Sequence, residues 1–420
     1  MDLKRVVVTG IGAITPLGNN VPETWENIKK GVSGAGPITK FDASLFKTRF
    51  ACEVKNFDVK QYIDRKSANK MDLYTQYAMV SAMEAVQDSA MDLETVNKER
   101  IGVILGVGIG GINTFEQEVS NYALHAADGP RYSPFFIPKM IADIAAGHIS
   151  IHYGFNGPNF ATTSACASST HALAVATDLI RLGKADAIVA GGAEAAIWPT
   201  GVGGFNALHA LSTRNDDPQH ASRPFSASRD GFVMGEGSAT LILEELEHAK
   251  ARGAKIYGEI AGSGMSADAY HITASHPEGL GANLVMKVAL QDAGMKPEDI
   301  DYINVHGTST PVGDISEVKA IQQVFGEHAY KLNISSTKSM TGHMLGAAGA
   351  VEALISLLSV KEDIVPPTIN HEEGDNDETI DYNLNFTFNK AQKRTVRAAL
   401  SNTFGFGGHN ACIIIKKYAE

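Results

Sequence analysis

One cysteine of this 420-residue sequence lies where a nucleophile could act. Cys166 is surrounded by small residues in ATTSACASST, immediately before a segment with a helical pattern. The unpaired N–H groups at a helix N-terminus favour a thiolate, so Cys166 is a candidate nucleophile. The alternative is a small buried core cysteine. Cys52 and Cys412 lie in apolar, strand-like runs, where a core position is the better interpretation.

Two histidines lie at matching places in the second part of the chain. His306 ends an apolar run in NVHGTSTPVGD, and His343 lies in SSTKSMTGHMLGAAGA before a helical segment. Strand ends and helix starts are where α/β proteins place reacting groups, although a single histidine is more often structural. Two imidazoles that converge on one sulfur could donate hydrogen bonds to a carbonyl that is becoming an enolate. Lys338 and Glu352 flank His343; on a surface they would be an ordinary ion pair, and beside buried histidines they could fix protonation states.

Two glycine-rich loops could also take part in chemistry. NTFGFGG at 402–408 lies between two predicted strands and could present backbone N–H groups as an oxyanion hole, with a phenylalanine able to move; a plain hairpin turn is the alternative. GVGIGG at 106–111 follows a strand, with Asp128 about 20 residues downstream, as in a dinucleotide-binding fingerprint. That fingerprint requires a strand ending at the acidic residue. NYALHAADGP instead has the pattern of a helix and a turn, so nicotinamide binding is disfavoured.

Composition excludes several classes of protein. Lys and Arg number 36 against 47 Asp and Glu, and this net charge of −11 argues against general nucleic-acid binding. No apolar run reaches the roughly 18 residues of a membrane span. Three distant cysteines are too few for a disulfide framework or a CxxC metal site. The start, MDLKR before VVVTGIGAITPLG, favours a first strand and turn over a signal peptide, so we expect a cytoplasmic protein.

Apolar runs rich in β-branched residues predict buried strands, and the segments between them have helical periodicity. Strands that alternate with helices indicate an α/β fold with a largely parallel sheet covered on both faces. The predicted strands are 5–9, 101–105, 187–191, 239–243, 300–305 and 411–415, and the helices include 72–90, 167–182, 284–293 and 347–359.

Two internal echoes predict that the chain is a duplicated α/β unit. AVQDSAM at 85–91 resembles ALQDAGM at 289–295, and each is predicted to end a helix before a strand. Segment 163–180 resembles 339–358, each a small-residue loop that opens into a helix. The join is placed near 249–257, which gives halves of residues 1–253 and 254–420. The acidic stretch 372–378 is expected to be a solvated loop.

Taken together, these motifs resemble those of the β-ketoacyl-[acyl-carrier-protein] synthases, most closely the type II enzymes of bacterial fatty-acid elongation. A Cys-His-His set distinguishes this branch from the Cys-His-Asn synthases that start chains on acyl-CoA and from thiolases, which use a second cysteine. The resemblance covers nearly the whole chain, through VVVTGIGAITPLG, VAGGAE, LSTRNDDP, ASRPF, RDGFVMGEG, VHGTSTPVGD, SSTKSMTGHMLGAAGAVE and SNTFGFGGHN.

The resemblance implies a thiolase-like fold, with duplicated α/β halves in five αβαβα layers, and a homodimer. It also implies elongation of acyl chains with a malonyl thioester by decarboxylative Claisen condensation, with acyl carrier protein as partner and no cofactor or metal. Neutral donors suffice for this reaction, because loss of carbon dioxide itself generates the carbanion. A type I elongation synthase or a polyketide ketosynthase of the same fold stays open. A catalytically silent partner subunit is disfavoured, because Cys166 is present.

The roles implied by the resemblance follow the motifs. Cys166 would take the acyl chain as a thioester, and His306 and His343 would bind the malonyl thioester carbonyl. Lys338, paired with Glu352, would support His343. The backbone N–H groups of Cys166 and Phe404 would form the oxyanion hole, and Phe404 would be the gate. The expected substrate-binding residues are Thr308 and Thr310 on the phosphopantetheine arm, Ile109 narrowing the acyl pocket, Phe205 and Gly405.

The carrier protein of this family is acidic, so docking onto a chain of net charge −11 requires a local basic patch. Asn69 and His209 occupy positions that are often basic in the family, which weakens this patch. His409 stands where the family usually has Thr, next to the expected gate. The candidate docking residues are Arg65, Lys66, Lys70 and Arg131.

Overall fold

Within residues 3–419, which the computed structural model describes, ten strands form one sheet in the order β10-β9-β13-β14-β8-β1-β7-β6-β4-β5. The sheet divides into two runs of five neighbouring strands, one from each half of the chain. If the strands of each run are numbered along the chain, both runs have the same order from the sheet edge to its centre: third, second, fourth, fifth, first. The first strands of the two runs pair antiparallel, Val6–Val8 with Gly258–Ile260. Of the nine neighbouring strand pairs in this sheet, four are parallel and five antiparallel, so the sheet is mixed and the prediction of a largely parallel sheet is wrong. The first run contains β1 (Val6–Ile14), β4 (Ile101–Gly106), β5 (Asn159–Thr162), β6 (Ala187–Glu194) and β7 (Gly237–Glu245), and the second contains β8 (Gly258–Ala267), β9 (Tyr302–Asn304), β10 (Asn333–Ser335), β13 (Ala398–Gly405) and β14 (His409–Lys416).

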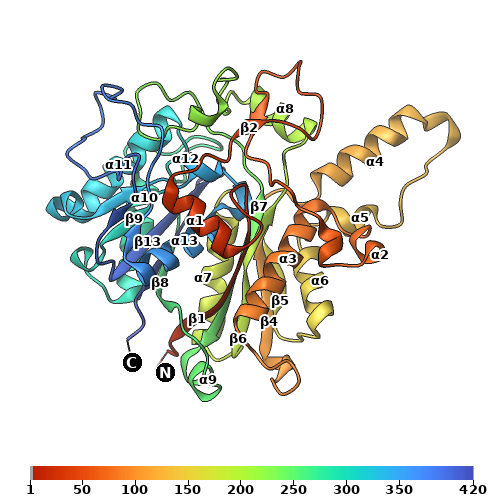
Figure 1. Cartoon of the computed structure of the whole chain (residues 1–420), viewed down its shortest axis with the longest axis horizontal. Helices are drawn as coiled ribbons and strands as arrows, with labels where there is room; N and C mark the ends of the chain where they lie inside the picture. Colours follow the sequence, from red (N-terminus) through yellow and green to blue (C-terminus); the bar gives the residue numbers. More distant parts are fainter. Residues whose placement is uncertain (1–2, 420) are drawn as a thin grey trace.

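Helices divide the molecule into layers (Figure 1). In the middle, α7 (Ser168–Arg181) and α13 (Ala348–Glu362) contact each other and strands of both runs. Every residue of α13 from Ala348 to Val360 is buried, as expected for a central helix that is apolar apart from Glu352 and two serines. The outer faces are covered by α3 (Leu73–Asp88) and α6 (Ile144–Tyr153) on one side and by α10 (Leu280–Ala293) and α11 (Pro311–Phe325) on the other. The five αβαβα layers of the predicted thiolase-like fold are therefore confirmed.

Both sequence echoes coincide with equivalent structure. The first pair ends α3 and α10, which pack on the equivalent strands β1 and β8. The second pair forms α7 in one half, and in the other α12 (Lys338–Thr341), the short turn η7 (Leu345–Ala347) and α13. The residue division 1–253 and 254–420 stays a prediction.

The first strand is longer than its apolar run predicts. It continues through two glycines, which leave room for a helix to pack closely against the strand. A Cβ at Gly10 would lie 2.2 Å from the Ala85 carbonyl oxygen, and one at Gly12 would lie 1.9 Å from that of Ser81. Both oxygens belong to α3, so the glycines expected to form a turn instead allow close packing of α3 on β1.

An arm projects from the body of the first half (Figure 1). It consists of α4 (Ile112–Leu124), η3 (Ala126–Asp128) and α5 (Phe136–Met140), and it carries several exposed aromatic and aliphatic side chains. No helix in residues 3–419 is long and apolar enough to cross a membrane. The other helices and turns are α1 (Val21–Lys30), η1 (Val59–Gln61), α2 (Arg65–Ala68), η2 (Lys98–Arg100), α8 (Pro199–Ala207), η4 (Pro218–His220), α9 (Leu246–Ala251), η5 (Pro297–Asp299) and η6 (Gly326–Tyr330), and the remaining strands form two small pairs, β2 (Gly36–Pro37) with β3 (Phe50–Ala51) and β11 (Ile364–Val365) with β12 (Gln392–Lys393).

Candidate active site

Cys166 lies in a tight turn between β5 and the N-terminus of α7. The preceding residue, Ala165, has φ of 51°, a left-handed conformation that non-glycine residues rarely adopt. The Ser168 hydroxyl holds this turn, since it donates to the Ala165 carbonyl at 2.6 Å and accepts from the Ser164 N–H at 2.9 Å. A Cβ at Gly405 would lie 2.8 Å from the Ser164 oxygen, so only glycine lets the loop after β13 approach the nucleophile. Local strain of this kind is common where a side chain must be presented for reaction.

Both predicted histidines line the same cavity as this sulfur. The Nε2 atom of His343 is 2.9 Å from Cys166 Sγ, although the two residues are 177 positions apart. The His306 and His343 rings are perpendicular, with centroids 5.3 Å apart. The Nδ1 atoms of both rings are buried without a hydrogen-bond partner among the described residues, so we assign the proton of each ring to Nε2. His343 then donates to the sulfur.

Burial sets the charge of all three groups. It lowers the pKa of His306 and of His343 well below the ordinary value, and the nearby Lys338 ammonium lowers both further. The imidazoles are therefore neutral at pH 7. Burial also raises the pKa of the Cys166 thiol to about 12, and Lys338 only partly offsets this. The resting sulfur is a thiol and not the thiolate expected from its helix N-terminus, because the cost of burying an anion exceeds the dipole's contribution.

Lys338 and Glu352 form a buried ion pair, with side chains 1% and 3% exposed. Lys338 begins α12 and Glu352 lies in the first half of α13, so the pair joins the two elements that flank His343. Burial raises the pKa of Glu352 to about 7, while Lys338 lowers it. Lys338 places a positive charge near the two neutral imidazoles, and its pairing with Glu352 is buried and not on the surface.

Glu317 of α11 is a site residue that the sequence analysis missed. Its carboxylate accepts the backbone N–H groups of His306 at 2.9 Å and of Gly307 at 2.8 Å, and the Asn402 amide at 3.2 Å. It therefore fixes the loop that carries His306. No local signal in the sequence marked this residue, because its segment PVGDISEVKAIQQVF contains several other charged and polar side chains.

A cavity of about 350 Å³ opens over the nucleophile. Its lining includes the catalytic candidates Cys166, His306, His343 and Phe404, and the substrate-binding candidates Thr308, Thr310, Phe205 and Gly405. The Thr308 and Thr310 hydroxyls are 3.0 Å apart. Ile109 is not among the lining residues, and its side chain is 39% exposed. The structure thus gathers four of the five predicted substrate-binding residues in one cavity and leaves Ile109 outside it.

The two phenylalanines of the loop at 402–408 have different positions. The Phe404 ring packs against the His306 ring, with centroids 5.6 Å apart. Phe406 lines the cavity, faces the Phe205 ring at 6.3 Å, and directs its backbone N–H at the Cys166 sulfur, as does the N–H of Cys166 itself. This contact favours Phe406 over the predicted Phe404 as the second N–H donor beside the nucleophile. Two phenylalanines separated by one glycine cannot be told apart by motif alone.

The loop GVGIGG is already occupied by protein. The N–H groups of Gly108, Ile109 and Gly110, which a pyrophosphate would need, donate to the buried carboxylate of Glu194. Asp128 lies in a short turn at the tip of the arm and not at a strand end. Both observations argue against nucleotide binding at this loop.

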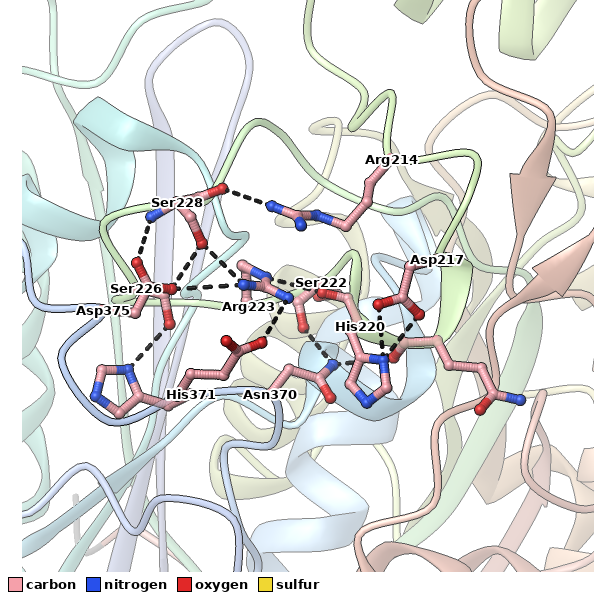
Figure 2. Close-up of polar contacts among 12 residues, drawn as sticks. Arg214, Asp217, His220, Ser222, Arg223, Ser226, Ser228, Asn370, His371 and Asp375 are labelled. Atoms are coloured by element: carbon pink, nitrogen blue, oxygen red, sulfur yellow. Dashed lines mark hydrogen bonds and ion pairs between the residues drawn. The ribbon is translucent and has the colours of Figure 1, made fainter.

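The acidic stretch 372–378 is not simply solvated (Figure 2). Asp375 accepts the backbone N–H of Ser228 at 2.8 Å and lies 3.5 Å from the buried guanidinium of Arg223, while Asp377 pairs with Arg229 at 2.9 Å. The segment that carries Arg223 and Ser228 is in turn tied to the site, because the hydroxyl of its Ser222 donates to the Lys338 carbonyl at 3.0 Å. The acidic loop thus braces the segment that supports Lys338, and the expectation of a merely solvated loop is corrected.

The predicted docking residues lie away from the cavity, on and beside α2 and the arm. Arg65, Lys66 and Arg131 are exposed, and the Lys70 ammonium lies 5.5 Å from the centre of the Phe135 ring. None of the four is among the cavity-lining residues, whereas His209 is.

Comparisons with known proteins agree with this geometry. Family models described as beta-ketoacyl synthase, N-terminal domain and C-terminal domain match residues 3–249 and 257–372. The chain is 50% identical to the 3-oxoacyl-[acyl-carrier-protein] synthase 2 of Synechocystis sp. over 419 residues, covering 100% of this chain and 99% of the relative. It is also 50% identical to the protein of the same name from Coxiella burnetii over 418 residues, covering 99% of each.

Solved structures extend the similarity to the whole fold. One is AntDE:AntF (apo), a type II PKS acyl-carrier protein in complex with its ketosynthase bound to the hexaketide; the match has a TM-score of 0.89 and 34% identity and covers 99% of this chain and 100% of that one. The family models, the full-length relatives and the Cys-His-His cavity lead to one conclusion: this chain belongs to the β-ketoacyl synthase family of condensing enzymes.

Proposed function

We propose that this chain elongates an acyl chain held on acyl carrier protein with a malonyl unit, by decarboxylative Claisen condensation, in fatty-acid synthesis. The observation that carries the proposal is the convergence of Cys166, His306 and His343 on one cavity, with both imidazoles neutral. The 50% identity to relatives named 3-oxoacyl-[acyl-carrier-protein] synthase 2 supports the choice of substrate.

In the first half-reaction, Cys166 Sγ attacks the carbonyl carbon of the acyl thioester. The new C–S bond forms as the bond to the phosphopantetheine sulfur breaks, and the thiol proton ends on that departing sulfur. The His343 Nε2–H, 2.9 Å from Sγ, stabilises the developing thiolate. The N–H groups of Cys166 and Phe406 are the candidate donors to the tetrahedral oxyanion. The acyl group is then held covalently where its partner will arrive.

In the second half-reaction, a malonyl thioester binds with its carbonyl oxygen between the two imidazoles. Loss of carbon dioxide leaves the electron pair on the enolate, whose oxygen accepts hydrogen bonds from His306 and His343. The enolate carbon forms a bond to the acyl carbonyl carbon as the C–S bond to Cys166 breaks, and the departing thiolate takes up a proton from solvent. The histidines must stay neutral donors throughout, and the buried Lys338 ammonium supports this by opposing a second positive charge beside it.

Other cavity residues suit the carrier arm. Thr308 and Thr310 place two hydroxyls on the cavity wall, and we assign them to the phosphopantetheine arm. We assign the gate to Phe406 in place of Phe404, and we retain the acyl-pocket role of Ile109 as a prediction. Acyl carrier protein is the proposed partner, in line with the carrier complex of the structural relative. Arg65, Lys66, Lys70 and Arg131 are its proposed docking residues.

We also propose a homodimer, a cytoplasmic location and the two units 1–253 and 254–420. The dimer is supported by β5, which ends the sheet order and pairs only with β4 within the described residues. A sheet edge of this kind is a template for pairing with a second copy. The exposed aromatic side chains of the arm, among them Phe115, Tyr122 and Tyr132, form a second apolar surface on the same half.

A polyketide ketosynthase remains the second candidate, because the structural match to AntDE covers the whole chain. The lower identity of 34%, against 50% for the fatty-acid relatives, favours elongation by a single unit. The products separate the two functions, since a polyketide enzyme adds several units before release.

The test is intact-mass spectrometry after incubation with a series of acyl-carrier thioesters, followed by malonyl-carrier protein. We expect one acyl group on Cys166, then one 3-oxoacyl product two carbons longer. The Cys166→Ser variant should lose condensation and keep malonyl-carrier decarboxylation, because both histidines remain. No acyl adduct on the wild-type protein would exclude the proposed function, and equal loss of both activities in the variant would contradict the division of labour.

A further inference from the structure

Glu194 is a buried carboxylate beside the site that the proposed reaction does not use. It ends β6, is 0% exposed, and accepts hydrogen bonds from the backbone of two loops. Gly108 donates to Oε2 at 2.9 Å, Ile109 to both oxygens at 3.2 Å, and Gly110 to Oε1 at 3.2 Å. Gly346 donates to Oε2 at 3.1 Å, across 152 positions of sequence. One side chain thus holds a loop of each half.

The backbones of these loops are in contact around the carboxylate. A Cβ at Gly346 would lie 2.2 Å from the Gly108 nitrogen and 2.7 Å from Glu194 Oε2, and one at Gly108 would lie 2.6 Å from the same oxygen. All the groups that contact the carboxylate are N–H donors, so both of its oxygen positions must be occupied by hydrogen-bond acceptors. An amide would direct its own N–H₂ group against one of them.

Both loops border the space beside the nucleophile. The first, residues 107–111, carries Ile109 and leads into Ile112, which packs in one apolar cluster with Cys166, Phe205 and Leu345. The second, residues 344–347, follows His343 directly, and Leu345 in it lines the cavity. Burial raises the pKa of Glu194 to about 7, although the four backbone N–H groups lower it, and its ionised form raises the pKa of the Cys166 thiol. Ile112 and Leu345 thus bring this junction into the apolar surroundings of the Cys166 sulfur, where an acyl chain on it would pack.

We propose that Glu194 is a positioning residue that determines acyl-chain selectivity by locking the Ile109 loop of the first half to the Leu345 loop of the second. The inference rests on the proposed function, because selectivity presupposes an acylated Cys166. Without the carboxylate, the two loops separate, and the wall that distinguishes chain lengths relaxes.

The experiment compares Glu194→Gln and Glu194→Asp with a matched control, Glu84→Gln. Glu84 is also a carboxylate that accepts two backbone N–H groups, those of Ala13 and Val21, but it lies on α3 away from the cavity. For each protein, kcat/KM is measured for acyl-carrier substrates from four to sixteen carbons, together with Tm. The selectivity ratio is kcat/KM for the preferred acyl chain divided by kcat/KM for a chain four carbons longer. In Glu194→Gln we expect this ratio to fall at least about fivefold. Glu194→Asp should recover part of that ratio, and Glu84→Gln should keep all of it.

A second readout is independent of the substrate. The rate at which iodoacetamide alkylates Cys166, followed against pH, should shift to lower pH in Glu194→Gln and stay unchanged in Glu84→Gln. Suppose the wild-type protein is acylated and a Glu194 variant folds. An unchanged selectivity ratio in that variant then overturns the inference and leaves the proposed function intact. Failure of both Glu194 variants to fold, with Glu84→Gln folded, assigns Glu194 to stability alone and also overturns it. A wild type that is never acylated overturns the proposed function itself.

Discussion

At the scale of single residues, the site combines one thiol that is a poor acid with two imidazoles that are poor bases. Burial produces both properties, because it penalises the charged form of each group. The chemistry requires this combination, since an imidazolium would give up its proton to the enolate instead of donating a hydrogen bond to it. Two further residues act through the histidines. The charge of Lys338 helps to keep both imidazoles neutral, and Glu317 fixes the backbone of His306 by accepting hydrogen bonds from it and from Gly307.

The two phenylalanines of the loop after β13 should affect different half-reactions. Phe404→Ala removes the ring packed on His306, so we expect malonyl decarboxylation to fall about tenfold while acyl transfer changes little. Phe406→Ala removes the ring that faces Phe205 in the cavity, so acyl transfer should fall and decarboxylation should be spared. Rates of the two half-reactions, measured separately for each variant, provide the check. The reverse assignment of effects would restore Phe404 as the gate.

At the scale of elements, Arg65, Lys66 and Lys70 on and beside the short helix α2, with Arg131 of the arm, place positive charge on an otherwise acidic protein. Lys66→Glu combined with Lys70→Glu should raise KM for the carrier-bound substrate and reduce its dependence on salt, because steering by opposite charge is lost. Acyl transfer from a small thioester without a carrier should be unaffected.

The matched control for this pair is Lys331→Glu with Lys393→Glu, two exposed lysines of the other half. It makes the same change in net charge at a different place, so it should leave KM unchanged. Equal effects of the two pairs would mean that overall charge, and not a docking patch on α2, controls the encounter.

At the scale of the whole molecule, the free edge of β5 predicts the assembly. Phe160 lies in this strand and is 37% exposed. Phe160→Lys places a charge where a second copy would pair, so we expect a wild-type dimer and a monomeric variant in sedimentation equilibrium. Leu45→Lys, at a side chain 97% exposed in a loop between β2 and β3, is the control and should remain dimeric. A monomeric wild-type protein would refute the dimer.

A buried carboxylate of the first half, that of Glu244, predicts how stability depends on pH. Burial disfavours ionisation of Glu244, but hydrogen bonds from Arg252, His248 and Thr9 outweigh it and lower its pKa to about 2. A carboxyl whose pKa is lower when folded stabilises the protein above its unfolded pKa, and that contribution disappears as pH falls through the folded pKa. Lowering from 4.5 to about 2 corresponds to about 3 kcal/mol.

Glu244→Gln should therefore be less stable than the wild type at pH 7, and the difference in unfolding free energy should shrink between about pH 5 and pH 2. His248 is protonated in both states over that range, so it does not contribute to the change. Urea unfolding at several pH values measures the difference. Glu278→Gln should show a much smaller trend, because solvent screens its exposed ion pair with Lys319, although that pair also lowers the pKa of Glu278. A difference that is constant with pH would mean that packing, and not charge, is lost.

The sequence by itself determined the fold class, the duplication and the identity of the reacting groups. Cys166, His306 and His343 each lie next to the end or the start of a predicted helix or strand. The hydrophobic periodicity and the glycines that mark such elements are local features of the sequence, so each residue could be recognised separately. The echoes at 85–91 and 289–295 likewise revealed the duplication without any knowledge of contacts.

Only the tertiary structure decided the contacts between the halves and the charges that follow from them. The hydrogen bond of His343 with Cys166 spans 177 positions and that of Gly346 with Glu194 spans 152, and no local pattern specifies which distant loop arrives. The neutral thiol, the N–H of Phe406 at the sulfur and the Glu194 junction went unpredicted for the same reason. A pKa and a close backbone approach depend on what surrounds a group from every side, and burial is settled only when all the layers have packed together.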